Sequence, residues 1–401
     1  MLFLNNFILI FFFFILLLFY LFFFNFYLGV FVFFFSDFFI ILFFMSLLIL
    51  GLVLMSEFNF NIKILSIFLI LISFFFFFSS NIFFLYFFFE MSIFPILIMI
   101  LGFGYQIEKI NSSYYMFFYT FFCSLPFFFF IFNIDLTFSF YFFDLFFSWE
   151  MVFLLSILFL MKFPVYFLHL WLPKAHVEAS TSASMLLAGL LLKLGTGGFF
   201  RILECLNFFF LGFYFLISFF GMVLSNFYCI FQSDLKSLAA FSSINHMSFV
   251  LFLLILFNIY SLWSSVVIMF SHGLISTLMF FFIGNFYYIS LTRLIYYYSS
   301  VFLSSLIFCS MVVFTWLFNG GIPFSLSFFS EFSGFLVIFN FSYYFFFFSF
   351  LYFFISFYYC LFFISLNFIG KKKMNFNFFL GYYGSFLLLM NCNFFLFYFF
   401  Y

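Results

Sequence analysis

The sequence predicts an all-α polytopic membrane protein with about 14 transmembrane helices, although about 13 is also possible. Of 401 residues only 11 are basic and 11 acidic, Phe alone accounts for 104, and long apolar runs follow one another along the chain. In lipid the backbone must satisfy its own hydrogen bonds, which leaves helices or a closed barrel. The runs are too long and too continuously apolar for a barrel's alternating strands, so we expect helices.

The composition also excludes several function classes. The formal net charge is zero, so the chain offers no basic surface to nucleic acid. The six cysteines are scattered with no C-x-x-C pair, which argues against a disulfide framework or a cluster site and favours small apolar residues in helices. No G-x-G-x-x-G follows a strand pattern, so we expect no cofactor in this chain. The cysteines are Cys123, Cys205, Cys229, Cys309, Cys360 and Cys392.

Polar breaks divide the chain into predicted spans. The first 80 residues hold about three or four of them by length. The N-terminal run lacks the basic start and cleavage site of a secretory signal and the Arg-rich pattern of a transit peptide, so we interpret it as a retained first span. The later spans are 81–101, 113–133, 146–170 (broken), 181–203, 208–231, 236–258, 262–286, 300–345 (broken), 346–368 and 379–401.

Loop charges alternate when followed from one break to the next. By the positive-inside rule, the loops rich in Lys and Arg face the cytoplasm, or the matrix of a mitochondrion. One set comprises Lys63, Lys109, Lys174, Lys236, Arg293 and Lys371 to Lys373, whereas the intervening loops hold Asp135, Asp144, Glu204 and, near a helix end, Arg201.

Six ionisable residues fall inside predicted spans. A charge at the bilayer centre costs about 2.5 to 3.5 kcal/mol, so each needs a functional or structural reason. Burial moves the pKa of a lysine down and of a glutamate up, and histidine titrates near neutral pH already, so such a set suits a proton relay. Purely structural ion pairing is the alternative. The six are Glu90, Lys162, Lys193, His246, His272 and Glu331.

Two of the spans are interrupted beside these residues. "KFP" breaks one at Pro164, and "NGGIPF" breaks another at Gly320, Gly321 and Pro323. Proline removes a helix donor, and non-helical backbone at depth is tolerated only where protein or a water-filled cavity satisfies it. Paired broken helices are typical of transporters built from inverted repeats, although a kink that merely helps packing is the alternative.

The motifs resemble those of a known family. The stretch "KFPVYFLHLWLPKAHVEASTSASMLLAGLLLKLGTGGFFRI" closely resembles the signature of the chain 4 family of mitochondrial NADH:ubiquinone oxidoreductase, respiratory complex I. "YFFFEMSIFPILIMILGFG" precedes it, and "SDLKSLAAFSSINHMSF" and "FSHGLISTLMF" follow in the family's order, so the resemblance covers residues 80–345. That family shares its fold with bacterial cation/proton antiporter subunits.

The resemblance implies an antiporter-like membrane-arm subunit with two inverted five-helix repeats. It implies that the family's proton-channel residues map onto the same six positions that depth selects. It further implies N-terminal transmembrane helices over 1–80, a first half-channel over 81–203, a second half-channel over 204–345 and C-terminal transmembrane helices over 346–401.

The expected function is proton translocation coupled to electron transfer in other subunits. The expected partners are neighbouring antiporter-like subunits and membrane lipids, with the mitochondrial inner membrane as the location. The excess of Phe hints at mitochondrial encoding in an AT-rich genome. Two alternatives remain: an Mrp-type cation/proton antiporter, and a structural membrane-arm subunit with a decayed channel. Against decay, all six ionisable residues persist amid heavy Phe substitution.

The resemblance also singles out a polar stretch as the proton entry. His169, Lys174, His176 and Glu178 match the family's "HLWLPKAHVEA". A polar helix cap held by internal hydrogen bonds is the alternative interpretation, and the spacing of the two histidines does not suit zinc. This chain departs from the family at Ser180, Ala183 and Ser330, where the family commonly has proline, glycine and glycine.

Two geometric expectations follow for the relay. We expect Glu90 and Lys162 to pair in the first half-channel, the acid modulating the pKa of the lysine. We expect Glu331 to end the relay, reached from Lys193 through His246 and His272, with the start of a half-helix favouring its charge. A carboxylate that only caps that helix is the alternative, and Ser330 is expected to contact the carboxylate or a water beside it.

Overall fold

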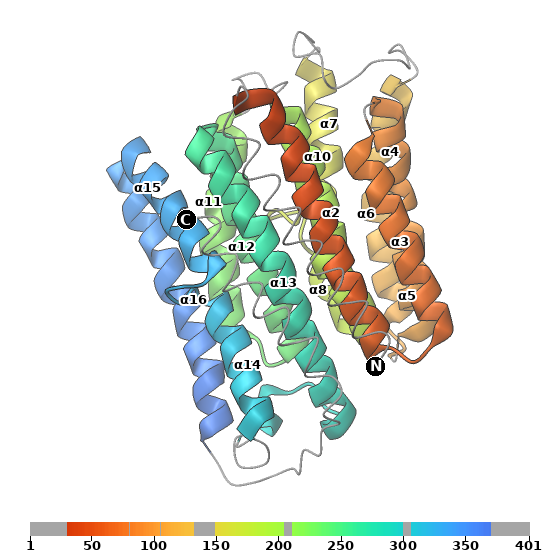
Figure 1. Ribbon diagram of the computed structural model, residues 1–401, viewed down its shortest axis with the longest axis vertical. Helices are drawn as coiled ribbons and strands as arrows, with labels where there is room; N and C mark the ends of the chain where they lie inside the picture. Colours follow the sequence, from red (N-terminus) through yellow and green to blue (C-terminus); the bar gives the residue numbers. More distant parts are fainter. Residues whose placement is uncertain are drawn as a thin grey trace.

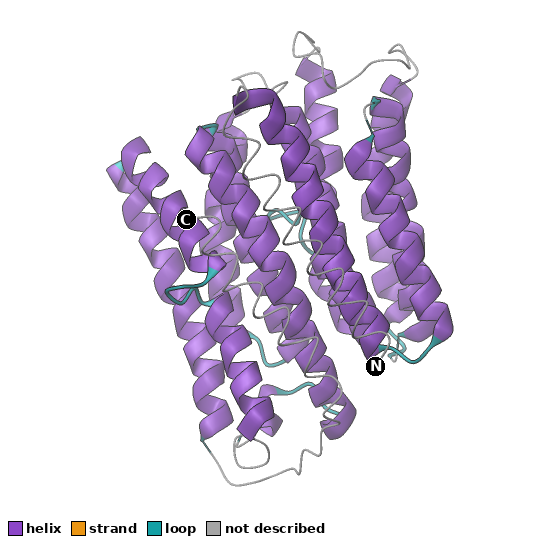
Figure 2. Cartoon of the chain, in the orientation of Figure 1, coloured by secondary structure: helices purple, strands orange, loops and turns teal. Residues whose placement is uncertain are grey.

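The computed structural model describes residues 30–79, 81–104, 106–131, 149–203, 211–299 and 306–369. Within these ranges the chain is a bundle of helices, which confirms the predicted all-α class (Figures 1 and 2). The helices are α2 (Val30–Ser56), α3 (Phe60–Phe78), α4 (Ile82–Met91), α5 (Ile93–Phe103), α6 (Lys109–Ile131), α7 (Trp149–Lys162), α8 (Trp171–Glu178), α9 (Thr181–Leu186), η1 (Leu187–Leu191), α10 (Leu192–Ile202), α11 (Leu211–Phe231), α12 (Leu235–Leu256), α13 (Ile259–Ser290), η3 (Ile295–Tyr298), α14 (Leu306–Asn319), α15 (Leu326–Phe341) and α16 (Tyr343–Phe368).

Eight of the described helical segments are long and apolar enough to cross a membrane. They match the predicted spans closely, and α6 and the two broken spans add shorter or less apolar helices. The predicted span 379–401 and those before residue 30 lie outside the described residues. The eight segments are Phe38–Ser56, Phe60–Phe78, Ile82–Phe103, Thr181–Ile202, Gly212–Phe231, Leu235–Leu256, Ile259–Tyr288 and Tyr343–Phe368.

The core is formed by three segments: α9 with η1 and α10, then α12, then α13. In their most apolar windows 94 to 100 % of residues are buried, against 39 to 44 % for α3, α11 and α16. Helix α13 contacts α12, α15, α14, α9 and α2 (Figure 1). The outer helices therefore present their Phe-rich faces outward, as expected for contact with lipid, while polar groups collect in the centre.

The first predicted break is confirmed. Helix α7 ends at Lys162, and α8 begins only at Trp171. The indole Nε1 of Trp171 donates a hydrogen bond to the Met161 carbonyl at 2.9 Å, which satisfies one acceptor that the break leaves without a helical partner. Phe167 takes a positive φ of 80° within the turn.

The second predicted break is also confirmed. Helix α14 ends at Asn319 and α15 begins at Leu326. Ser325 caps α15 by accepting the Phe328 N–H at 3.2 Å. Ser327 Oγ donates to the Phe318 carbonyl at 2.7 Å, so side chains from α15 satisfy the open end of α14.

Two further interruptions were not predicted. The span around Glu90 is divided at Ser92 into α4 and α5, and Pro95 has no N–H to donate to the carbonyl one turn earlier. A single π turn, Leu187–Leu191, lies between α9 and α10. Such turns occur often at functional sites. Each of these irregularities lies next to one of the buried lysines.

Three of the basic residues that were predicted to share one side lie at the same end of the bundle. The Leu235 N–H donates to the Arg293 carbonyl at 3.1 Å. Lys236 Nζ donates to the Ala179 carbonyl at 2.7 Å. Glu108, next to Lys109, lines one cavity with Glu178 and Arg293, which places Lys109 at the same end. The prediction that Lys236 is a loop charge was wrong in one respect. The residue is buried and belongs to the first turn of α12. Asp135, Asp144, Glu204 and Lys371 lie outside the described residues.

Candidate functional site

The centre of the bundle holds Lys193, a fully buried residue on α10. Its Nζ donates to the Ala188 carbonyl of the π turn at 2.7 Å and lies 3.0 Å from His272 Nδ1 on α13. The lysine therefore has one partner that only accepts a hydrogen bond and one that can also exchange a proton.

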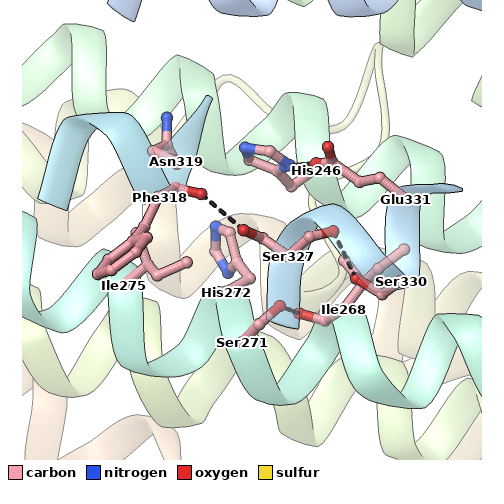
Figure 3. A pocket seen from close by; sticks show the side chains of 10 residues that line it. All are labelled: His246, Ile268, Ser271, His272, Ile275, Phe318, Asn319, Ser327, Ser330 and Glu331. Atoms are coloured by element: carbon pink, nitrogen blue, oxygen red, sulfur yellow. Dashed lines mark hydrogen bonds and ion pairs between the residues drawn. The ribbon is translucent and has the colours of Figure 1, made fainter. Parts of the chain in front are cut away.

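The contacts continue from His272 toward α15. The rings of His272 and His246 lie 5.5 Å apart between centroids. His246 Nδ1 in turn lies 3.4 Å from Glu331 Oε1 and 3.0 Å from the Tyr352 hydroxyl. Figure 3 shows the His246 and Glu331 side chains next to each other, with His272 on the neighbouring helix. All four residues are at most 4 % exposed.

A small cavity bridges the two histidines. The volume open to the centre of a water molecule is about 10 Å³, which is space for roughly one water. Its polar walls supply hydroxyl, amide, imidazole and carboxylate groups. The lining residues are His246, Ile268, Ser271, His272, Ile275, Phe318, Asn319, Ser327, Ser330 and Glu331 (Figure 3).

The second break shapes the surroundings of Glu331. Gly321 has a positive φ of 71°, and a Cβ built there would lie 2.6 Å from Glu331 Oε2. Glycine is therefore required twice, by its backbone angle and by the carboxylate that approaches it. Glu331 is the sixth residue of α15 and so lies in its second turn, beyond the first turn within which a helix start favours a carboxylate.

Lys162 is a buried lysine in the segment that was predicted to form the first half-channel. Its Nζ donates to the Phe89 carbonyl and, at 2.9 Å, to Ser92 Oγ, and it lies 3.5 Å from the centre of the Phe89 ring. Because α4 ends at Met91, the Phe89 carbonyl belongs to its last turn, whose partial negative charge attracts an ammonium group. The unpredicted break at Ser92 thus supplies both hydrogen-bond acceptors of the Lys162 ammonium group.

Glu90 is half-buried on α4. It is close enough to Lys162 for their charges to interact. Glu90 and Lys162, which were expected to pair, therefore interact only through their charges. The two side chains, both within the described ranges, form no direct ion pair.

The four predicted entry residues do not join into one chain of contacts. His169 stacks on Tyr166 with centroids 4.9 Å apart, and Lys174 is exposed with its Nζ 3.5 Å over the Tyr115 ring. His176 stacks on Phe280 at 4.4 Å, and neither of its buried ring nitrogens has a hydrogen-bond partner.

Glu178, the fourth of them, lines a larger cavity at the basic end of the bundle. This cavity has a volume of about 370 Å³ and also touches Glu108, Asp234 and Arg293. Glu178 Oε2 and two nitrogens of Arg293 are buried and have no hydrogen-bond partner among the described residues. Glu178 lies outside the eight long apolar segments; burial raises the pKa of its carboxyl, and the Arg293 charge opposes part of that shift.

Sequence reasoning missed Tyr352, Asn319 and Ser327. Tyr352 belongs to one of many aromatic runs, and nothing local distinguishes it from the other 25 tyrosines. Ser330, which was expected to contact the carboxylate or a water beside it, lines the cavity next to Glu331. Its hydroxyl donates to the Ser327 carbonyl at 2.8 Å and not to Glu331. Ser180, another departure, caps α9 by accepting the Ala183 N–H at 3.4 Å.

Among the described residues no group of three His, Cys, Asp or Glu side chains is arranged to hold a metal ion. The buried ionisable groups include lysines, histidines and carboxylates. Intramembrane ionisable groups beside interrupted helices are typical of membrane transporters of ions or protons.

The chain belongs to the NADH:quinone oxidoreductase/Mrp antiporter transmembrane family, whose model matches residues 79–357. It is 56 % identical over 251 residues to NADH-ubiquinone oxidoreductase chain 4 of Caenorhabditis elegans, covering 63 % of this chain and 61 % of that protein. The same chain of Ascaris suum is 56 % identical over 243 residues, covering 61 % and 59 %. The resemblance to the chain 4 family is therefore confirmed, although the match spans about three fifths of these relatives.

Solved structures show the same fold at low identity. A chain of respiratory complex I from Thermus thermophilus with bound NADH has a TM-score of 0.78 and 19 % identity, covering 90 % of this chain and 80 % of that one. A chain of the Mrp complex from Dietzia sp. has a TM-score of 0.74 and 13 % identity, covering 83 % and 67 %. At these identities the likeness concerns the fold alone.

Proposed function

We propose that this chain is a proton-translocating, antiporter-like membrane subunit of NADH:ubiquinone oxidoreductase. The observation that carries the proposal is the contact between Lys193 and His272 at 3.0 Å, continued through His246 to Glu331. Each of these groups accepts and releases protons, and each is buried among apolar helices where a charge without a role would be costly.

In the second half-channel the proton moves along side chains. Lys193 gives a proton to Nδ1 of His272. A water in the small cavity carries a proton from His272 to His246, since both rings line it. His246 Nδ1 then delivers a proton toward Oε1 of Glu331, 3.4 Å away, from which it leaves.

In the first half-channel Lys162 is the proton carrier and Glu90 modulates it. The charge of Glu90 favours the protonated amine, so a change in the charge or distance of the carboxylate alters how readily Lys162 releases its proton. The direct partners of the lysine, Phe89 and Ser92, hold it in place.

Protons enter from the basic end of the bundle. Glu178 takes them from the larger cavity, and His176, which has two free ring nitrogens, lies within the electrostatic range of both Lys236 and Lys193. His169 and Lys174 belong to the same polar stretch and contribute to its charge.

The proposal includes the family's wider architecture. About 14 helices contain two inverted five-helix repeats, with half-channels over 81–203 and 204–345 between terminal helices over 1–80 and 346–401. The redox chemistry and its cofactors belong to other subunits. The location is the mitochondrial inner membrane, and the partners are neighbouring membrane-arm subunits and lipids.

An Mrp-type antiporter is the second candidate, favoured by the fold it shares with the Dietzia complex. The 56 % identity to complex I chains favours the first. Co-purification separates them: the proposed subunit is recovered with flavin- and cluster-bearing chains, whereas an Mrp subunit is not. Recovery of a stable assembly without these chains would exclude the complex I assignment.

The test of the relay is Lys193→Met in the assembled complex. We expect proton pumping in proteoliposomes to fall at least about tenfold, because an apolar side chain cannot carry a proton, while the complex remains assembled on a native gel. Lys63→Met, at the start of α3 and away from the buried groups, is the matched control and should pump normally. Normal pumping by Lys193→Met would exclude the relay.

A further inference from the structure

A buried tyrosine lies between the last two members of the relay. Tyr352 of α16 is 1 % exposed, and its hydroxyl lies 3.0 Å from His246 Nδ1 and 3.5 Å from Glu331 Oε1. The direct distance between Nδ1 and Oε1 is 3.4 Å, long compared with the roughly 2.7 to 2.9 Å of a charge-assisted hydrogen bond. The phenol therefore offers a contact to the histidine shorter than the one the carboxylate offers. Its own 3.5 Å contact to the carboxylate must shorten for a proton to pass.

Packing holds this hydroxyl in position. The Tyr352 ring is stacked on Phe249 with centroids 5.1 Å apart and an interplanar angle of 18°. On the backbone side, Asn226 Nδ2 of α11 donates to the Tyr352 carbonyl at 3.0 Å. Because a buried phenol needs a hydrogen-bond partner, the two partners available to it among the described residues, His246 and Glu331, fix what it can do.

We propose that the Tyr352 hydroxyl carries the proton between His246 and Glu331, which rests on the proposed relay. The N–H bond at Nδ1 of protonated His246 breaks, and its proton binds the phenol oxygen. At the same time the phenol's own O–H bond breaks, and that proton binds Oε1 of Glu331. The histidine and the carboxylate both become neutral, and the tyrosine is neutral before and after.

The exchange leaves the hydroxyl pointing differently. Before transfer the phenol accepts from Nδ1 and donates to the carboxylate, and afterwards it donates to Nδ1. Rotation of the hydroxyl about its C–O bond restores the first arrangement for the next proton. Such a step needs no ionised tyrosine, so burial of the phenol in an apolar surrounding does not oppose it.

The experiment compares Tyr352→Phe with Tyr359→Phe in the assembled complex. Tyr359 is a matched control, because it lies on the same helix, is 1 % exposed, and accepts a hydrogen bond from Asn319 at 3.4 Å. We expect Tyr352→Phe to lower proton pumping in proteoliposomes at least about tenfold, because phenylalanine has no hydroxyl to carry the proton, and Tyr359→Phe to leave it unchanged. Equal pumping by Tyr352→Phe and the unmodified chain, or equal loss in both variants, would overturn the proposal.

A second variant separates proton transfer from packing. Tyr352→His keeps a ring that accepts and donates protons but stacks less well on Phe249, so proton transfer predicts more pumping than in Tyr352→Phe. A packing role predicts the reverse order, and that order would overturn the proposal. Glu331→Gln completes the set: normal pumping there would refute the whole relay, whereas its loss beside a normal Tyr352→Phe would refute only the role of the tyrosine.

Discussion

The two buried lysines are held in different ways. Lys193 contacts a histidine side chain, and that histidine leads through a cavity to a second histidine and a glutamate. Lys162 is bonded to a backbone carbonyl and a serine hydroxyl at a helix break, while the nearest carboxylate, Glu90, acts through its charge. In the proposed mechanism, the second half-channel is a row of side chains that carry protons. The first holds a lysine that is fixed by hydrogen bonds and lies within range of the Glu90 charge.

In the proposed relay, this difference gives the two halves of the protein different roles. A backbone carbonyl accepts a hydrogen bond but does not take up a proton at physiological pH, whereas an imidazole does. Lys193 therefore has a built-in proton acceptor and Lys162 does not. Transfer from Lys162 requires the lysine to leave the Phe89 carbonyl or a water to reach it, so the first half-channel is suited to gating and the second to conduction.

The largest effect that distinguishes the two halves is expected from His272→Leu. Leucine fills a similar volume but removes the acceptor next to Lys193, so pumping should fall by at least about tenfold, equal to roughly 1.4 kcal/mol of barrier. The measurement is proton uptake into proteoliposomes during NADH oxidation by the complex. Ser265→Ala is the control, because this buried serine lies on the same helix, bonds only the Leu262 carbonyl and does not line the cavity. Retained pumping would mean that Lys193 delivers its proton by another route.

Gly321→Ala should have the next largest effect. The added Cβ meets Glu331 Oε2 and takes a backbone angle that favours glycine, at a cost of about 1 to 3 kcal/mol. We expect a lower melting temperature of the purified complex and a several-fold loss of pumping because the carboxylate is displaced. Gly102→Ala is the matched control, since a Cβ there meets nothing within 4 Å. Equal behaviour of both variants would contradict this account of the second break.

Much of this arrangement was predictable from the sequence. Hydropathy and charge located the six ionisable residues, and Pro164 and the Gly320–Pro323 turn located both breaks, because proline and glycine act through the local backbone. The role of those six residues stays a prediction. The contacts between Lys193, His272, His246 and Glu331 came within reach because all four lie at similar depth in spans that pack together.

What the sequence did not indicate depends on packing between distant segments. Tyr352 meets His246 across 106 residues, and one tyrosine among many aromatic residues has no local mark. The bond from Lys162 to the Phe89 carbonyl requires the interruption at Ser92, which a serine three residues before a proline only hints at. The stacking of His176 on Phe280 likewise depends on how α8 lies against α13.

A smaller effect is expected from Glu90→Gln, which removes the negative charge near Lys162 but leaves the hydrogen bonds of the lysine in place. Because the lysine keeps its bonds to Phe89 and Ser92, we expect pumping to fall by about two- to threefold, equivalent to roughly 0.4 to 0.7 kcal/mol. Assembly should be unchanged. Glu150→Gln, an exposed acid at the start of α7, is the control. A loss as large as that of His272→Leu would show that both halves conduct through side chains and would remove the contrast between them.

The smallest effect, confined to pH values above the pKa of the Glu178 carboxyl, is expected from Glu178→Gln at the cavity of the proposed entry. Burial raises the pKa of the Glu178 carboxyl, so the group is neutral below that pKa and charged above it. Glutamine resembles the neutral form, so the variant should match the unmodified chain at acidic pH. It should pump more slowly as pH rises through the pKa, when protons become scarce and the carboxylate would attract them. Glu108→Gln, an exposed acid on the same cavity, tests whether the general charge of the cavity suffices, and it should shift the profile less. Parallel pH profiles for Glu178→Gln and the unmodified chain would place the entry elsewhere, and a deficit that grew toward acidic pH would contradict the sign of this argument.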